Sequence, residues 1–272
     1  MKVRNVFLSG LLVLILAGSI FSCKRQQAGE FTIRDGVLTI GMEIGYPPME
    51  YYGPDGRTPM GFDVDMGKAI AEKLGLEAEF VDTAWDGIFS AVQTNRIDAI
   101  MSSVTITPAR QQVHNFSRPY IANAMTIVTR KDSPFKPRNP AGLEGLGVAY
   151  QAETTAQFFM ARLVDETGLR YTPFAYERVM SCFDELRLGR VDVIVTDGVV
   201  AGDYAAPADS IFEVTWQGDP DEFFGVCMRG GNDALTEAIN QALNELFQDG
   251  TMRRISMQHL GIDMVTPARN TW

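Results

Sequence analysis

The chain has 272 residues, of which 46% are hydrophobic and 21% are charged, and its formal net charge is −10. This composition is typical of globular proteins and is sufficient for the core of one large domain or two small ones. The excess of acidic residues argues against nucleic acid or an anionic membrane surface as the main partner.

The N-terminus has the composition of an export signal. Lys2 and Arg4 give it a positive start, residues 6–16 are almost entirely apolar, and small residues follow. The apolar run ends at Ile20-Phe21-Ser22-Cys23, which resembles a bacterial lipobox. We therefore predict a signal peptide over 1–22, lipidation of Cys23 and a lipid-anchored tether over 23–30. The protein would then lie in the periplasm or at the cell surface, held at the membrane by this anchor alone. The alternative is ordinary cleavage near Ser19, with Cys23 incidental.

The first half of the remaining chain alternates between strand and helix patterns. Apolar residues recur at helical spacing over 66–74 and 85–92. Runs typical of strands occupy residues 37–43, 77–82, 97–101 and 125–129. This alternation predicts an α/β fold with mixed, mostly parallel sheets.

A stretch rich in proline and glycine, residues 131–145, interrupts the alternation and is typical of a surface connection. After it the pattern restarts. Strands are predicted at 147–150, 172–176 and 191–196, with helices at 155–166 and 179–188. The order helix, turn, Arg-aliphatic-Asp and buried strand occurs in both halves, at Arg96-Ile97-Asp98 and at Arg190-Val191-Asp192. The repetition predicts two similar lobes.

The end of the chain is predicted to return to the first lobe. Residues 223–228 have a strand pattern, and Asn232 precedes a helix with an apolar stripe that Asp249-Gly250 closes. Crossings at 125–130 and 223–229 would make a two-strand hinge. We assign residues 31–127 and 224–272 to lobe 1 and residues 128–223 to lobe 2, with a ligand cleft between the lobes.

The other cysteines and the histidines give no sign of a metal site. Cys182 lies on an apolar helix stripe and Cys227 inside a predicted strand, so we expect free buried thiols, although an oxidising compartment would permit a disulfide. His114 and His259 share no motif, and there is no CxxC. Neither a metal site nor a cofactor is predicted.

The segment 102–110 is suited to holding a small carboxylate. Thr107 and Pro108 are preferred residues for the cap and the first position of a helix. Arg110 then lies in the first turn, where a guanidinium can grip a carboxylate through two parallel hydrogen bonds. Ser103 and Thr105 offer hydroxyls and amides beside it. The alternative for Arg110 is a surface arginine paired with a nearby acid.

Five segments, in this order along the chain, resemble the extracytoplasmic solute-binding proteins that deliver polar amino acids to ABC importers (family 3). They are GFDVDM at 61–66, TITPAR at 105–110, FSRPY at 116–120, VDVIVTD at 191–197 and DGT at 249–251. The resemblance covers nearly all of the predicted mature chain. It implies a two-lobe fold like that of the type II periplasmic binding proteins. It also implies a monomeric receptor that captures a polar L-amino acid and docks on an ABC transporter permease, without a chemical step or a cofactor.

The resemblance further implies roles for single residues at the cleft. It makes Arg110 the clamp for the ligand α-carboxylate, helped by Ser103 and Thr105, and Asp197 the acceptor of hydrogen bonds from the ligand ammonium. Asp197 also ends a buried strand, the position at which open α/β sheets bind ligands. Its alternative role is a cap for the helix that follows.

Other positions are expected to complete the site. Thr154 and Thr155 match a loop whose backbone N–H groups face the ligand carboxylate, and their alternative role is plain helix capping. Tyr46 and Trp85 match positions where the family stacks aromatic rings on the ligand, although Trp85 also lies on the core stripe of its helix. Glu43 matches an acidic position that can contact the ligand amine, and its alternative is a solvated acid at a strand end.

One residue departs from the family pattern. Glu153 stands where the family usually has glycine, just before the paired threonines, which puts the backbone contact at Thr154 in question. A carboxylate there would either favour a cationic ligand or point to solvent. It also leaves an enzymatic alternative open, a secreted cyclohexadienyl (prephenate or arogenate) dehydratase on the same fold, which needs a carboxyl group as general acid.

Overall fold

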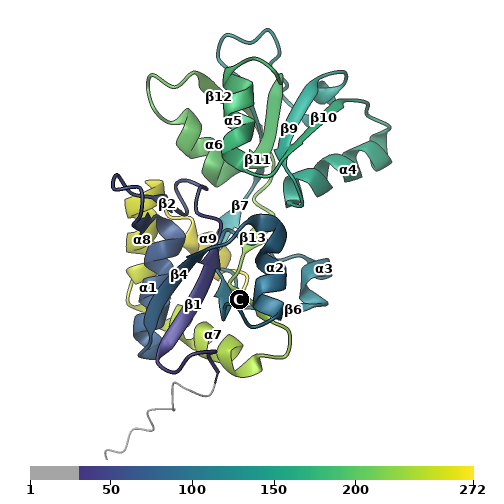
Figure 1. Ribbon diagram of the computed structural model, residues 1–272. Coiled ribbons are helices and arrows are strands. Elements are labelled where there is room, and N and C mark those ends of the chain that lie inside the picture. The colour runs from purple at the N-terminus through teal and green to yellow at the C-terminus, as the bar shows by residue number, and fades with distance from the viewer. Residues whose placement is uncertain (1–30) are drawn as a thin grey trace, which may run out of the picture.

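Each lobe of the molecule is built on one mixed five-stranded sheet (Figure 1). The computed structural model describes residues 31–272, so the predicted signal peptide and the tether with Cys23 lie outside the described residues. The first sheet has the order β4 (Glu77–Asp82), β1 (Val37–Met42), β5 (Ala99–Ile100), β14 (Cys227–Arg229) and β6 (His114–Phe116). The second has the order β10 (Thr172–Tyr176), β9 (Gly147–Gln151), β11 (Val193–Asp197), β8 (Met125–Arg130) and β12 (Phe212–Gln217).

The two sheets share one topology. In each, the first three strands run parallel and the fourth runs antiparallel to both of its neighbours. The predicted fold class, an α/β protein with two similar lobes, is therefore confirmed.

The Arg-aliphatic-Asp repeat has the same structural role in both lobes. Asp98 accepts a hydrogen bond from the backbone N–H of Thr39 on β1 (2.8 Å), and Asp192 accepts one from the N–H of Gly147 on β9 (2.7 Å). Each aspartate ties the turn after a helix, α2 (Trp85–Gln93) or α5 (Val179–Arg187), to the neighbouring parallel strand. The repeated sequence thus reflects a repeated contact.

Helices cover the first sheet and include the C-terminal part of the chain. Helix α1 (Phe62–Leu74) packs on β4 and against α7 (Asp233–Gln248) and α8 (Thr251–Leu260). The Asn232 side chain caps α7 by accepting a hydrogen bond from the Leu235 N–H, as predicted, and the apolar stripe of α7 is buried. The lobe also contains α3 (Pro108–Gln111), α9 (Val265–Arg269) and a hairpin of β2 (Tyr51–Tyr52) and β3 (Pro59–Met60).

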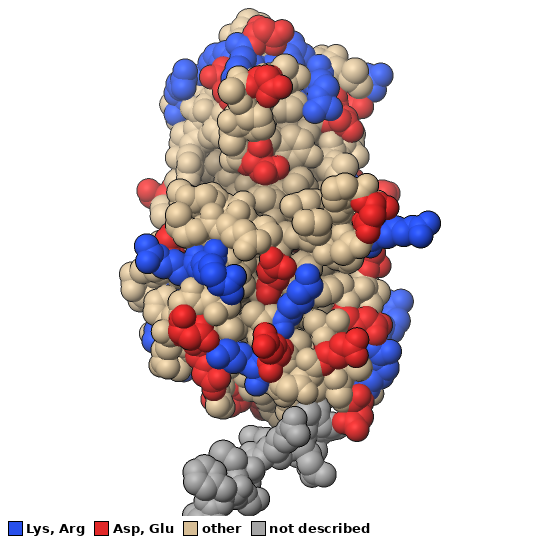
Figure 2. All heavy atoms as spheres, turned by 90° about the vertical axis from the view of Figure 1, so that its left-hand side faces the viewer, with Lys and Arg blue, Asp and Glu red and all other residues tan. Residues whose placement is uncertain are grey.

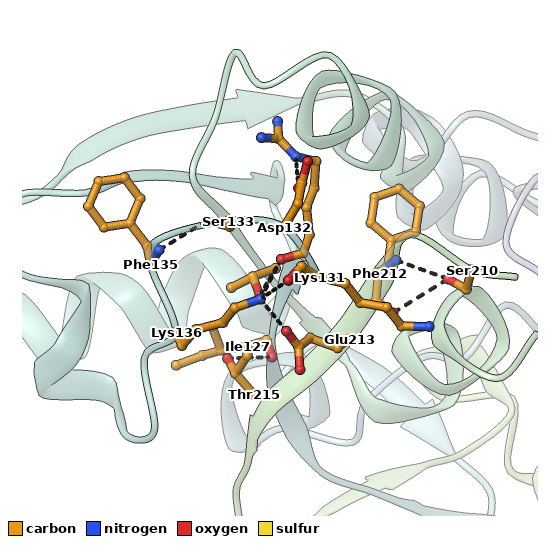
Figure 3. Close-up of polar contacts among 12 residues, drawn as sticks. Ile127, Lys131, Asp132, Ser133, Phe135, Lys136, Ser210, Phe212, Glu213 and Thr215 are labelled. Carbon is orange, nitrogen blue, oxygen red and sulfur yellow. Dashed lines mark hydrogen bonds and ion pairs between the residues drawn. The ribbon is translucent and has the colours of Figure 1, made fainter. Parts of the chain in front are cut away.

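The second sheet carries α4 (Thr155–Thr167), α5 and α6 (Gly198–Ala205). Lys136 connects the predicted surface connection of this lobe, residues 131–145, to the sheet by hydrogen bonds and an ion pair (Figure 3). The Lys136 ammonium donates to the carbonyls of Arg130 (2.7 Å) and Lys131 (2.9 Å) and pairs with Glu213 on β12. A 3-10 helix, η1 (Pro140–Leu143), follows and buries Leu143. The connection is therefore an ordered part of its lobe.

Two short strands, β7 (Ile121–Asn123) and β13 (Glu222–Phe224), run between the lobes (Figure 1) and pair antiparallel, with Asn123 opposite Glu222. These crossings lie a few residues earlier in the chain than the predicted 125–130 and 223–229. Most of the predicted residues instead form β8 and β14 inside the sheets. The reason is that β7 and β8 are almost continuous in the chain, with only Ala124 between them.

Cys182 on α5 and Cys227 on β14 are free and buried, as predicted. Burial raises the pKa of each thiol to about 12, which makes both unreactive at neutral pH. Among the helices of residues 31–272, none is long and apolar enough to cross a membrane. On the face shown in Figure 2, basic and acidic side chains are interspersed, which is not the one-sign surface expected for nucleic acid binding.

Candidate ligand-binding site

The carboxyl ends of strands from both lobes meet at a small cavity. All nine predicted ligand-contacting residues line it, together with two that were not predicted. The lining residues are Glu43, Tyr46, Trp85, Ser102, Ser103, Thr105, Arg110, Gln151, Thr154, Thr155 and Asp197. The remaining space is about 20 Å³, enough for about one water molecule, so the side chains of the two lobes lie in contact.

Parallel strands explain why these residues meet. Glu43 follows β1, Ser103 and Thr105 follow β5, Thr154 follows β9, and Asp197 ends β11. The carboxyl ends of parallel strands share one edge of a sheet, and these edges of the two sheets face each other. The two lobes therefore contribute opposite walls of one cavity.

Arg110 is held by the aromatic residues of α2. Its guanidinium lies over the rings of Trp85 (5.4 Å to the centroid) and Phe89 (5.0 Å), and Nη1 donates to the carbonyl of Thr105 (2.9 Å). Thr107 caps α3 by accepting a hydrogen bond from the Arg110 N–H, with Pro108 at the first position, as predicted. No carboxylate forms an ion pair with Arg110 among residues 31–272. Burial lowers the pKa of this guanidinium from its usual value. The alternative of a surface ion pair is therefore wrong for the described part of the chain.

Ser103 presents a hydroxyl with spare hydrogen-bonding capacity. Its backbone has φ +51°, a left-handed conformation that is uncommon without glycine. The Asp63 carboxylate holds it by accepting hydrogen bonds from the Ser103 N–H (2.8 Å) and the Tyr120 hydroxyl (3.1 Å). Ser103 is buried, with an exposed fraction of 6%. Its hydroxyl has no hydrogen-bond partner within residues 31–272. A buried polar group without a partner costs about 1–3 kcal/mol, which a bound ligand can recover.

Asp197 is a buried acceptor rather than a helix cap. Its carboxylate accepts hydrogen bonds from the Tyr46 hydroxyl and from Asn123 Nδ2 (2.8 Å), and it makes no capping bond to α6. Burial raises the pKa of this carboxyl, whereas the hydrogen bonds from Tyr46 and Asn123 lower it. Asp197 therefore has donors that favour its ionised form in a place with little solvent.

Glu43 is also buried, with an exposed fraction of 4%, so the alternative of a solvated acid is wrong. Its Oε2 accepts a hydrogen bond from Gln151 Nε2 (2.7 Å), which reaches across from the second lobe. Burial raises the pKa of Glu43 to about 7, against the opposing effects of Gln151 and Arg178. Near neutral pH this carboxyl group is poised between its two protonation states.

The second-lobe loop before α4 contacts Trp85. The indole Nε1 donates to the carbonyl of Glu153 (3.2 Å), and the Trp85 ring also packs with Ile88, so it has both a cavity-facing and a core role. Glu153 takes a left-handed conformation (φ +60°), which explains the glycine usual at this position. Its side chain is exposed. Thr154 does not cap α4 with its side chain but donates from Oγ1 to the Gln151 carbonyl (2.8 Å).

Sequence reasoning missed four residues that shape the site. Ser102 and Gln151 lie beside predicted positions, and a wider reading of those segments would have found them. Asn123 and Glu222 lie on the crossing strands, and no local pattern marks either one. Asn123 Nδ2 donates both to Asp197 (2.8 Å) and to Glu222 (2.9 Å). The crossing between the lobes is thus hydrogen-bonded to the site.

A larger cavity of about 1080 Å³ adjoins the small one. Thr105, Arg110 and Thr155 line both. The large cavity is slightly above the range of about 300–1,000 Å³ that is usual for ligand pockets, whereas the small cavity is far below it. Together they form a continuous cleft between the lobes.

Two lobes of one topology, joined by two short strands and enclosing a guanidinium, buried carboxylates and hydroxyls, define a binding protein for a small charged solute. Residues 38–262 match the sequence model of a protein family, the bacterial extracellular solute-binding proteins, family 3. The chain belongs to this family.

Individual relatives agree with this assignment. The chain is 30% identical over 229 residues to the L-cystine-binding protein TcyJ of Escherichia coli (strain K12), covering 84% of each protein. It is 27% identical over 225 residues to ABC transporter arginine-binding protein 1 of the same strain, covering 81% of this chain and 89% of that one. In structure it resembles an ancestral arginine-binding protein bound to arginine, with a TM-score of 0.77 and 32% identity, covering 82% of this chain and 98% of that chain.

These findings confirm the predicted class, an extracytoplasmic amino-acid-binding protein of an ABC transporter. These relatives are all named as binding proteins, which argues against the dehydratase alternative.

Proposed function

We propose that the protein captures a polar L-amino acid as a zwitterion between its lobes and delivers it to the permease of an ABC importer. Arg110 carries this proposal. Its guanidinium is enclosed by Trp85 and Phe89, and no carboxylate pairs with it within residues 31–272. A ligand α-carboxylate would supply the missing counter-charge through two parallel hydrogen bonds.

The other predicted residues would complete the ligand contacts. Asp197 would accept the ligand ammonium, and the Ser103 and Thr105 hydroxyls would assist at the carboxylate. Thr154 and Thr155 would close on the ligand from the start of α4, and Glu43, Tyr46 and Trp85 would contact its side chain. Closure about β7 and β13 would bring the two walls together, because these strands are the crossing between the lobes.

The names of the relatives suggest which ligands to test first. One relative is named for cystine and others for arginine. We propose arginine and cystine as the leading candidates among the polar amino acids.

We also propose that Cys23 is lipidated and anchors a monomeric receptor at the membrane, in the periplasm or at the cell surface. The lipobox-like sequence Ile20-Phe21-Ser22-Cys23 and the polar tether after it support this proposal.

A thermal-shift screen tests the amino-acid proposal. The chain from Lys24 onward would be unfolded and refolded to remove retained ligand, then screened against the common amino acids, cystine and prephenate. Ligand at a hundred times its Kd adds roughly 2.7 kcal/mol to the stability of the folded state. A large shift with polar amino acids supports the proposal. A response to prephenate alone would support the dehydratase, and silence throughout would contradict amino-acid binding.

A further inference from the structure

Glu222 lines the large cavity, and Asn123 links it to Asp197 of the small cavity. It is on the crossing strand β13, opposite Asn123, and it lines the large cavity together with Arg110 and Thr155. Its Oε2 accepts a hydrogen bond from the same Asn123 amide that donates to Asp197. One amide therefore fixes two carboxylates, of which Asp197 lines the small cavity and Glu222 the large one.

The charges that line the cleft are unbalanced. Of residues 31–272, two arginines, Arg110 and Arg162, and no lysines line the two cavities. The acidic residues of this range that line them are Glu43, Glu153, Asp197, Asp219, Asp221 and Glu222. A simple zwitterion adds one charge of each sign and leaves this excess unchanged. Burial, with the neighbouring Asp197, raises the pKa of Glu222 to about 7. A cation beside Glu222 would therefore relieve an electrostatic cost that is already present.

The surroundings of Glu222 favour it over Glu43 as the site of that cation. Glu43 faces the small cavity, whose remaining space of about 20 Å³ leaves no room for the distal group of a long ligand. Glu222 faces about 1080 Å³, and the wall beyond it carries the stacked rings of Phe159 and Trp216, 5.9 Å apart. Such a wall suits the apolar middle of a long ligand. In the small cavity, the Ser103 hydroxyl has no hydrogen-bond partner within residues 31–272, so the head group of a ligand bound there could supply one.

We propose that Glu222 is a specificity-determining residue that binds a second cationic group of the ligand, an ammonium or a guanidinium, while Arg110 and Asp197 hold the α-amino acid head. The proposal rests on the proposed function and narrows it. The ligand is an amino acid with two positive groups, and arginine, lysine and cystine share this chemistry.

Isothermal titration calorimetry on the full-length protein and its Glu222→Gln variant tests the proposal. The probes are arginine, lysine and cystine, each with two positive groups at neutral pH, and glutamine, with one. We expect Glu222→Gln to weaken binding of at least one two-cation probe by tenfold or more and to leave glutamine within about twofold, consistent with the loss of a charged hydrogen bond. Which probe loses affinity identifies the distal group. Melting temperatures would confirm that the isosteric variant folds.

Glu166→Gln is the matched control, because Glu166 is an exposed glutamate on α4 that lines neither cavity. It should leave every Kd within about twofold. The proposal is overturned if Glu222→Gln weakens all probes equally or none, or if Glu43→Gln removes the preference for two-cation ligands while Glu222→Gln retains it. Wild-type protein that binds amino acids without any preference for a second cation overturns only this inference. Wild-type protein that binds no amino acid overturns the proposed function itself.

Discussion

The hydroxyl of Tyr46 in the first lobe donates a hydrogen bond to the carboxylate of Asp197 in the second. Two further bonds cross between the lobes nearby, from Trp85 to the carbonyl of Glu153 and from Gln151 to Glu43. The small cavity is lined by the five residues whose side chains make these bonds, Tyr46, Asp197, Trp85, Gln151 and Glu43. The groups proposed to meet a ligand are thus also the groups that hold the lobes together.

Tyr46→Phe should therefore open the ligand-free protein. The change removes one interlobe hydrogen bond, which contributes about 0.5–1.5 kcal/mol, and shifts the equilibrium toward separated lobes. Small-angle X-ray scattering should give a larger radius of gyration for the ligand-free variant than for wild type. Both should have the same radius at saturating ligand. An unchanged ligand-free radius would show that other contacts determine closure.

Arg110→Met should abolish ligand binding and leave the fold intact. The change removes two charged hydrogen bonds to the ligand, each contributing about 1.5–3 kcal/mol, so we expect Kd to rise by about a hundredfold or more. Calorimetry measures the affinity and a melting curve the fold. Arg162→Met is the control, because Arg162 is an exposed arginine that also lines the large cavity. Affinity retained in Arg110→Met, with a normal melting curve, would disprove the clamp.

The stability of the ligand-free protein should fall as pH rises from about 5 to about 7. Burial raises the pKa of Glu43 from 4.5 to about 7. Between these two values the folded state retains a proton that the unfolded state has released, so rising pH favours unfolding. Urea titrations across this range measure the slope of the unfolding free energy. Glu43→Gln cannot titrate there and should show a shallower slope, and an equal slope would exclude Glu43 as a contributor.

Glu153→Gly should stabilise the protein slightly and change its ligand preference. A left-handed conformation costs a residue other than glycine about 1–2 kcal/mol, while the added freedom of glycine in the unfolded chain returns about 0.4–1 kcal/mol of that. We expect a net gain of about 0–1.6 kcal/mol, measured by urea unfolding. Loss of the carboxylate should weaken cationic ligands a few-fold. Glu153→Gln should reproduce the second effect without the first. A ligand profile that neither variant changes would place Glu153 on the solvated surface.

Cys23→Ser should release the protein from membranes, because it removes the proposed site of lipidation. Fractionation of cells and metabolic labelling with a fatty acid measure the anchor. Cys182→Ala is the control and should remain in the membrane fraction, since Cys182 is buried in the second lobe. A Cys23→Ser protein that still sediments with membranes and carries label would refute the anchor.

Much of the site could be predicted because its residues match the family pattern, and several of them follow parallel strands in the structure. Once the strands were located, Glu43, Thr105 and Asp197 had to lie at the same edges of the two sheets. Arg110 was predictable for a local reason, because Thr107 and Pro108 determine where its short helix begins.

The rest depends on contacts between distant residues. Asn123 and Glu222 are 99 residues apart, and neither has a neighbour in sequence that signals a site. The crossing positions were displaced because only Ala124 separates β7 from β8 in the chain, so no sequence signal marks where one strand ends and the next begins. For two residues of the second lobe, the sequence did not decide between a ligand-binding role and a helix-capping role. Thr154 and Asp197 both occupy the position of a helix cap, yet the side chain of each bonds elsewhere.

The position of β14 has a consequence for the order in which the molecule is made. The second sheet is formed by one uninterrupted stretch, from β8 to β12, whereas the first sheet needs β14 between β5 and β6. A chain that emerges during synthesis can therefore complete its second lobe while β5 and β6 of the first lobe still lack β14, the strand that lies between them. Thr105 of the binding site also depends on this part of the chain, because its backbone forms a β-bridge with Phe224. The wall that carries Arg110 is thus completed only after the chain of the second lobe has been made.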